Sequence, residues 1–293
     1  MYGAVEAGGT KFVCAVGTGP DNLLERVQFP TRTPEETMAR VIAFFKPHLS
    51  RLEAIGVGTF GPVDVHPTSP TYGTITSTPK PGWQYFNIRE ALERALHVPV
   101  YVETDVNAAA LGEHQWGAGQ GLHTFVYITV GTGIGGGALV EGHLLHGLMH
   151  PEMGHMRVPH YQDQDPFPGI CPFHGDCLEG LASGPAMAER WHADPATLPP
   201  EHPAWDLEAH YLAWAVVNLV TILAPQRVIL GGGVMHQEHL FPRIRDKASR
   251  ILADYVAPLA SEDAWETYIV PPALGDNAGI LGALALALRE NAG

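Results

Sequence analysis

The apolar positions of this chain fall into short runs with the spacing of strands, and segments with helical spacing separate them. In the first half, runs bounded by glycine or proline predict five strands, at residues 3–7, 12–16, 26–29, 54–58 and 98–103. The last run is apolar through most of its length, which is typical of a strand buried on both faces. Strands that alternate with helices predict an α/β fold.

Two capping signals mark helix starts in the same half. Thr33 has a proline after it and Glu36 three residues on, so we predict a helix over 34–45. Asn87 with Glu90 has the same spacing and predicts a second helix. These residues favour helix starts because their side chains bind backbone N–H groups that the first turn leaves unpaired.

The second half repeats the alternation of strands and helices. We predict strands at 125–130, 136–140 and 227–230, and helices at 206–223, 240–253 and from 277 onward. Each half also opens with a strand that runs into a glycine-rich turn and then into a second strand. Residues 150–184 differ, because they are rich in Pro, Gly, His and Cys and show no sustained period. We interpret them as an insertion that carries chemistry.

Length and composition exclude several classes of protein. The 293 residues suffice for one large or two ordinary domains, and 45% of them are hydrophobic, enough for a core. A net charge of −14 argues against nucleic acid binding, which depends on cations that displace counterions from phosphates. No apolar run reaches the roughly 18 residues of a membrane span, and the first residues lack the pattern of a secretory signal. With only three cysteines, we expect a protein of the reducing cytoplasm.

The glycine-rich turns are candidate phosphate sites. Glycines let backbone N–H groups approach a ligand closely, and Thr10, Lys11 and Thr132 add hydroxyls and a cation. Residues 131–136 contain G-x-G-x-x-G, but the chain continues as a strand where a dinucleotide fold needs a helix. Either turn alone is an ordinary hairpin. Together with the triple glycine at 231–233, which follows a strand directly, the two turns favour two phosphate clamps and a nucleoside platform.

Asp105 is the candidate for acid–base chemistry. It follows the predicted strand at 98–103, where a carboxylate can face a cleft. Phosphoryl transfer to a hydroxyl needs a group that accepts the hydroxyl proton. The alternative is that Asp105 only caps the helix that follows.

The insertion contains a candidate metal site. Cys171, His174 and Cys177 offer three ligands within seven residues, a spacing that favours Zn²⁺ over hard cations. The local candidates for a fourth ligand are His150, His155 and His160. Four protein ligands would leave no water on the metal, which disfavours a zinc hydrolase.

Five segments together resemble the ROK family of sugar kinases, and more narrowly its fructokinase branch. In chain order they are EAGGTK at 6–11, TDVNAA at 104–109, GTGIG at 131–135, PEMGH at 151–155 and CPFHGDCLEG at 171–180. The resemblance implies an α/β, actin-like (ribonuclease H-like) two-domain fold with an inserted zinc-binding loop. It also implies Mg-ATP as phosphate donor, transfer to the 6-hydroxyl of a hexose, a structural zinc and a homodimer.

The resemblance implies roles for single residues. It makes Asp105 the catalytic base and selects His155 as the fourth ligand beside Cys171, His174 and Cys177. The expected sugar site comprises Gly61, Thr78, Thr104, Asp105, Glu152, His155 and Glu179. The expected ATP site comprises Gly8, Gly9, Thr10, Lys11, Gly131, Thr132, Gly133, Gly180, Gly231, Gly232 and Gly233.

Two residues depart from the family pattern. Glu6 stands where many relatives have Asp, which leaves the construction of the Mg²⁺ shell open. Thr104 stands where the glucokinase branch has Asn, so an amide that touches the sugar in those relatives is missing. Both departures suit a fructokinase-like specificity.

We therefore expect an ATP-dependent fructokinase. Its N-terminal lobe would span residues 1–110 and its C-terminal lobe 111–293, with a zinc loop at about 150–184 and the last helix returning to the N-terminal lobe. Three alternatives stay open: a kinase for mannose, glucose or N-acetylmannosamine, a non-catalytic sugar-binding module, and a sugar-responsive repressor. The repressor is disfavoured because it would place a helix-turn-helix ahead of a hairpin that here begins by residue 8.

Overall fold

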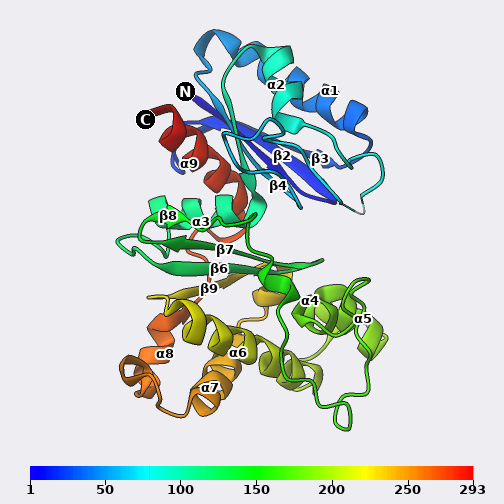
Figure 1. The fold of residues 1–293 in the computed structure, drawn as a ribbon, viewed down its shortest axis with the longest axis vertical. Coiled ribbons are helices and arrows are strands. Elements are labelled where there is room, and N and C mark those ends of the chain that lie inside the picture. Colours follow the sequence, from blue (N-terminus) through cyan, green and yellow to red (C-terminus); the bar gives the residue numbers. More distant parts are fainter. Residues whose placement is uncertain (79, 293) are drawn as a thin grey trace. The chain divides into compact units, whose positions relative to one another are not determined.

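The computed structural model describes residues 1–78 and 80–292, which form two compact units. The first unit contains Met1–Gly121, Leu144–Pro151 and the C-terminal segment from Ala273. The second unit contains Leu122–His143 and Glu152–Pro272. Each unit is built around its own mixed sheet (Figure 1).

The sheet of the first unit has the strand order β3-β2-β1-β4-β5. Its strands are β1 (Tyr2–Ala7), β2 (Lys11–Gly17), β3 (Leu23–Pro30), β4 (Ile55–Thr59) and β5 (Val100–Thr104). The first three strands form an antiparallel meander, whereas β1, β4 and β5 run parallel. The register places Ala7 beside Thr59 and Thr59 beside Thr104, so the parallel strands end at one edge. The first glycine turn and Asp105 both begin at this carboxyl edge.

Two helices of the first unit begin where the capping signals predict. The helices of this unit are α1 (Pro34–Phe45), α2 (Ile88–Leu96), α3 (Asp105–Trp116) and α9 (Ala278–Ala292), with short 3₁₀ turns η1 (Lys46–Arg51) and η6 (Gly275–Asn277). The Thr33 hydroxyl accepts a hydrogen bond from the Glu36 N–H, and the Asn87 side chain accepts one from the Glu90 N–H. Local sequence therefore decides both helix starts.

The last helix, α9, packs in the first unit against α3 and the sheet (Figure 1). A Cβ on Gly282 would lie 1.8 Å from the Ala108 carbonyl oxygen, and one on Gly56 would lie 1.9 Å from the Ala283 carbonyl oxygen. Backbones approach this closely only where a side chain is absent. This packing ties α3 and α9 together, so the observed first unit continues past the expected boundary at residue 110 to Gly121 and takes in the C-terminal segment.

The sheet of the second unit has the strand order β10-β9-β6-β7-β8. Its strands are β6 (Phe125–Val130), β7 (Ile134–Val140), β8 (His143–Leu144), β9 (Val228–Gly231) and β10 (Ile269–Val270). The pair β6–β7 is antiparallel, and β9 lies parallel to both β6 and β10. This repeats the start of the first unit, where a hairpin is followed by parallel additions.

The second unit carries more helices than the sequence pattern predicts. They are α4 (Leu178–Ala182), α5 (Gly184–Trp191), α6 (Ala204–Leu223), α7 (Leu240–Leu252) and α8 (Glu262–Tyr268), with 3₁₀ turns η2 (Met153–His155), η3 (Pro195–Thr197), η4 (Gly233–His236) and η5 (Ala257–Leu259). Of these, α6 and α7 were expected, and α4, α5 and α8 are too short to show a clear period. The Ser183 hydroxyl caps α5 by accepting the Ala186 N–H.

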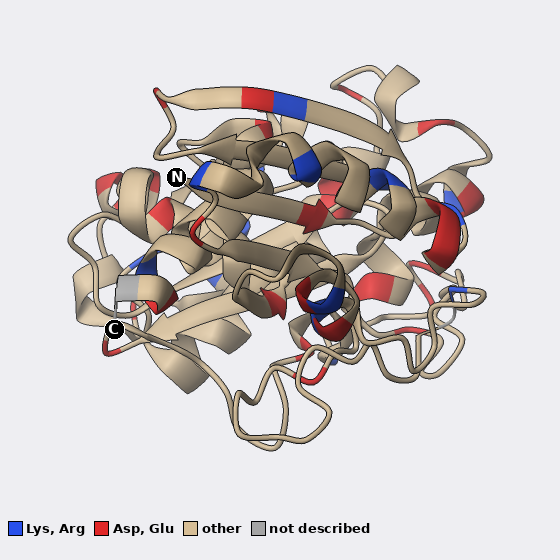
Figure 2. Cartoon of the chain, turned by 90° about the horizontal axis from the view of Figure 1, so that it is seen from above, with Lys and Arg blue, Asp and Glu red and all other residues tan. Residues whose placement is uncertain are grey.

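No helix in the described part of the chain is long and apolar enough to span a membrane. Lys and Arg residues lie singly on many elements and form no continuous stripe in the view of Figure 2. This distribution agrees with the acidic balance of the sequence.

Candidate functional site

The first glycine turn is open to solvent at its tip. The Gly8 N–H donates to the Lys11 carbonyl oxygen at 2.9 Å, and a Cβ on Gly8 would lie 2.8 Å from that oxygen. A Cβ on Gly9 would meet no atom within 4 Å, and Gly9, Thr10 and Lys11 are exposed. The turn therefore offers free space beside backbone groups and one cation, as a phosphate site requires.

Glu6 lies in β1 just before this turn. A Cβ on Gly279 of α9 would lie 2.7 Å from the Glu6 carboxyl carbon, so the glycine makes room for this carboxyl group. Burial raises the pKa of Glu6, and the neighbouring cations Lys11 and Arg26 oppose this rise. The carboxyl group of Glu6 therefore lies in a partly desolvated place next to the turn.

The second glycine turn is held by the start of α4 and α5. The Gly131 N–H donates to the Gly133 carbonyl oxygen at 2.9 Å, while the Gly131 carbonyl oxygen accepts the Gly184 N–H at 2.8 Å. A Glu179 carboxylate oxygen accepts the Ile134 N–H at 2.9 Å, and a Cβ on Gly133 would lie 2.7 Å from that oxygen. Glu179, expected in the sugar site, thus also fixes the shape of the turn. Thr132 at its tip is exposed.

The other glycines expected at the nucleotide occupy two different places. Gly231 ends β9. Gly232 has a φ of +91°, and a Cβ on it would lie 2.5 Å from the Val130 carbonyl oxygen. A Cβ on Gly233 would meet no atom within 4 Å. Gly180 instead packs on the metal loop, where a Cβ would lie 1.9 Å from the Gly175 carbonyl oxygen. Gly180 is therefore required by the close approach of two backbones.

Asp105 is the first residue of α3, and the helix cap is Thr104. The Thr104 hydroxyl accepts the Asn107 N–H at 3.1 Å, whereas an Asp105 carboxylate oxygen accepts the N–H of Val106 at 2.9 Å. The capping role considered for Asp105 thus belongs to Thr104. The Asp105 side chain is half-buried at the carboxyl edge of the first sheet, and a carboxylate can act as a general base for a hydroxyl within hydrogen-bond reach.

Close to Asp105 in the sequence, Glu103 belongs to a buried polar cluster that the sequence pattern did not reveal. Glu103 is 3% exposed and accepts hydrogen bonds from the Thr104 N–H at 2.8 Å and the Asn107 amide at 3.0 Å. Its second oxygen lies 2.6 Å from His146 Nε2, and this hydrogen bond raises the pKa of His146. The one available signal was a carboxylate at the end of an otherwise apolar strand. The cluster holds the start of α3 to the segment that carries His146.

The raised pKa of His146 predicts a pH-dependent stability. An unfolded histidine titrates near about 6.5, so the stabilisation by protonated His146 is fully present below that pH and is lost as pH rises through the folded pKa. We expect the difference in urea midpoint between wild type and His146→Gln to shrink from pH 5.5 to pH 9. For His143→Gln, which replaces an exposed histidine, the difference in urea midpoint from wild type should not change with pH. A pH-independent difference for His146→Gln would contradict the prediction.

Glycines also position the expected sugar-binding residues of the second unit. A Cβ on Gly154 would lie 1.7 Å from the Ile134 carbonyl oxygen, so η2 lies directly on β7. The His155 N–H donates to the Glu152 carbonyl oxygen at 3.0 Å, which sets these two residues on one turn. Within the first unit, the expected sugar residues are Gly61, Thr78, Thr104 and Asp105. Thr78 is 7% exposed.

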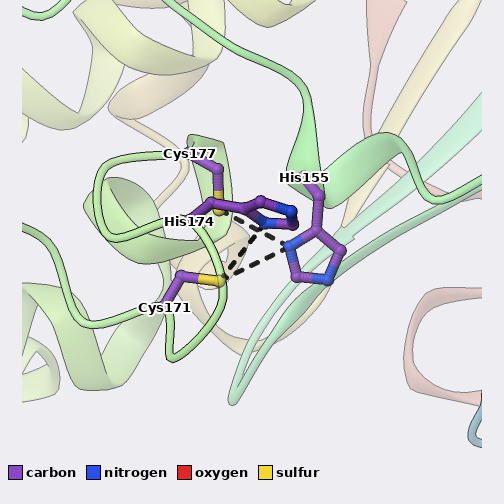
Figure 3. Close-up of side chains that lie close together, drawn as sticks. All are labelled: His155, Cys171, His174 and Cys177. Carbon is purple, nitrogen blue, oxygen red and sulfur yellow. Dashed lines mark hydrogen bonds between the residues drawn. The ribbon is translucent and has the colours of Figure 1, made fainter. Parts of the chain in front are cut away.

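Four side chains of the insertion converge on one point (Figure 3). The ligand atoms of His155, Cys171, His174 and Cys177 all lie within 4.8 Å of one another. Cys171 Sγ lies 3.7 Å from His155 Nδ1 and 3.6 Å from His174 Nδ1, and Cys177 Sγ lies 3.5 Å from His155 Nδ1. Both sulfurs are buried, and burial raises the pKa of the Cys177 thiol to about 11.

The three S···N distances lie close to those of a tetrahedral Zn²⁺ site. With Zn–S about 2.3 Å and Zn–N about 2.05 Å, a tetrahedral S···N edge is about 3.6 Å. The donor set of two thiols and two imidazoles is also the one that zinc prefers. The residues present therefore fit this metal.

The other two candidate histidines have different partners. His150 Nε2 accepts the Val63 N–H at 3.2 Å in the first unit. His160 lies between the Asp165 carbonyl oxygen, 2.9 Å from Nε2, and the Asp176 carboxylate, 3.3 Å from Nδ1. Both ring nitrogens of His160 are thus engaged, and this histidine connects two segments of the insertion, at Asp165 and Asp176.

Comparisons with known proteins agree with this architecture. The ROK family profile matches residues 2–290. A protein of Bacillus subtilis (strain 168) is 50% identical over 98% of this chain and 95% of its own length, and a "Fructokinase" of Pediococcus pentosaceus is 45% identical over 98% and 97%. The crystal structure of a ROK family glucokinase from Streptomyces griseus, in complex with glucose and AMPPNP, has a TM-score of 0.77 at 26% identity over 98% of this chain and 99% of its own. The α/β actin-like fold expected from the motifs is confirmed, and the chain belongs to the ROK family.

Proposed function

We propose that this chain is an ATP-dependent fructokinase, which transfers the γ-phosphate of ATP to the 6-hydroxyl of D-fructose. The observation that carries the proposal is the 45% identity to a fructokinase over nearly the whole length of both chains. Half-buried Asp105, at the same sheet edge as the open glycine turn of β1–β2, supports it. Kinase activity brings with it Mg-ATP as the phosphate donor.

The residues divide the reaction between them. Asp105 accepts the proton of the 6-hydroxyl while that oxygen forms a bond to the γ-phosphorus and the bond from the γ-phosphorus to the ADP oxygen breaks. The turns at 8–11 and 131–133 bind the phosphates through backbone N–H groups and Lys11, with Gly231, Gly232 and Gly233 beside the nucleoside. Bound Mg²⁺ would neutralise charge on the phosphate oxygens. Glu152, His155 and Glu179 orient the sugar hydroxyls, together with Gly61, Thr78 and Thr104.

The Cys/His cluster is proposed to hold one structural Zn²⁺. Four protein ligands close the coordination shell, so the metal orders the loop and takes no part in the chemistry. Its two cysteines must be thiolates, a state that agrees with the reducing cytoplasm. The homodimer implied by the family stays a prediction, which sedimentation of the metal-loaded protein would test.

The first experiment measures ADP release with Mg-ATP and fructose, mannose, glucose or N-acetylmannosamine, with total zinc read on the same sample. Fructose should give the highest kcat/KM, with about one zinc per chain. A higher kcat/KM for another hexose would support the kinase activity but identify that hexose as the preferred substrate. If sugar binds without ATP and no ADP is released, the protein is a non-catalytic sugar-binding module and the kinase proposal is wrong.

Removal of zinc should loosen the insertion and leave the first sheet unchanged. Because the metal joins His155 to the segment 171–177, its loss frees the chain between them. We expect faster amide hydrogen exchange over residues 157–177 after chelation, with unchanged exchange in β1 and β4 as the internal control. Equal exchange before and after chelation would show that the loop is ordered without metal.

A further inference from the structure

A second lysine reaches the first glycine turn. The Lys80 ammonium group donates a hydrogen bond to the Gly9 carbonyl oxygen, and both residues belong to the first unit. In the described part of the chain, no carboxylate lies within ion-pair distance of this ammonium group. Lys80 as a residue is half-buried, and its ammonium group meets the Gly9 carbonyl at an exposed position that an anion can reach.

The backbone of Lys80 is anchored to the strand that leaves the turn. The Trp83 N–H donates to the Lys80 carbonyl oxygen at 3.2 Å, and the Lys80 N–H donates to the Thr78 hydroxyl at 3.3 Å. Trp83 is fully buried, lies 5.3 Å from the Phe12 ring between centroids, and donates from its indole to the Arg32 carbonyl oxygen at 2.8 Å. Core packing at Trp83 therefore sets the backbone position from which the Lys80 side chain reaches Gly9.

The charge balance makes this placement unusual. The chain has a net charge of −14 and contains four lysines, of which Lys11 and Lys80 both lie at this turn. A neutral carbonyl is a weaker partner for an ammonium group than an anionic oxygen is. An anion that enters the open space at Gly9 would therefore offer Lys80 a better partner than the one it has.

We propose that Lys80 is a second phosphate-binding cation. Its ammonium group moves from the Gly9 carbonyl oxygen to the transferred phosphoryl group when ATP binds. This inference rests on the proposed kinase function. During transfer, the bond from the sugar oxygen to phosphorus forms, the bond from phosphorus to the ADP oxygen breaks, and the hydroxyl proton goes to Asp105. The Lys80 ammonium keeps its own proton throughout and stabilises the negative charge on the phosphoryl oxygens.

Kinetics of charge variants test the role. Lys80→Met should lower kcat with fructose by about 100-fold or more, in line with the loss of one preorganised donor to a transition state. The KM for fructose should stay unchanged, and Lys80→Arg should recover part of the rate because it restores the positive charge. Lys46→Met is the matched control, because Lys46 is exposed at the end of α1. Wild-type turnover by a correctly folded Lys80→Met would overturn the proposal.

Chemical labelling tests it without turnover. In the wild-type protein, Mg-ATP should slow acylation of Lys80 and Lys11, read by peptide mass spectrometry, and leave Lys46 unaffected. Unchanged labelling of Lys80 at saturating Mg-ATP would overturn the proposal. The two hypotheses fail separately: protection of Lys80 with no turnover on any sugar refutes the fructokinase, whereas turnover without protection refutes the role of Lys80.

Discussion

Replacement of Asp105 by asparagine is expected to lower kcat with fructose by about 100- to 10,000-fold, the contribution typical of a positioned general base. Asparagine has nearly the same shape but cannot accept the hydroxyl proton at neutral pH. The start of α3 should persist, because the Thr104 hydroxyl caps the helix. The binding of Mg-ATP, measured by calorimetry, should therefore be unchanged while the turnover rate falls.

Asp21→Asn provides the matched control, since it removes the same charge at an exposed position in the loop before β3. Its kcat should equal that of the wild type. Equal turnover by Asp105→Asn would exclude Asp105 as the base. A loss of ATP binding and of thermal stability in Asp105→Asn would show a structural role in its place.

Gly154→Ala is expected to have the second large effect. Its new Cβ would lie 1.7 Å from the Ile134 carbonyl oxygen, which cannot move without distorting β7 and the turn beside it. Overpacking of this kind costs about 1–3 kcal/mol of stability. The displaced η2 carries His155 and adjoins Glu152, and a shift of about 1 Å in a positioning group can cost about 100-fold in rate. We expect kcat/KM for fructose to fall by about that factor.

Gly147→Ala is the control for this substitution. A Cβ at Gly147 would meet no atom within 4 Å, so its unfolding midpoint and kcat/KM should match those of the wild type. A Gly154→Ala protein with normal stability and normal kinetics would show that η2 can shift without consequence. Loss of stability with normal kcat/KM for fructose would separate the packing of η2 from the sugar site.

The sequence alone determined the features that depend on neighbouring residues. The helix starts at Thr33 and Asn87 are correct because each capping contact spans only three residues. The strand 125–130 is correct to the residue, and the ends of the other expected strands shift by up to three residues, the most at the start of β3. Three of the four proposed metal ligands, at 171–177, were also visible locally, because a structural zinc site takes part of its ligands from one short segment.

Tertiary structure decided what depends on residues far apart along the chain. The bond from Glu103 to His146 joins positions 43 apart, and no local pattern marks such a pair. The three histidines His150, His155 and His160 were equivalent candidates in the sequence. Only the fold distinguishes their roles, because each contacts different partners. The return of α9 to the first unit was expected only through the family resemblance, because it depends on close backbone packing at Gly282 that no local pattern shows. Local energetics select the elements, whereas burial and long-range pairing select which side chains meet.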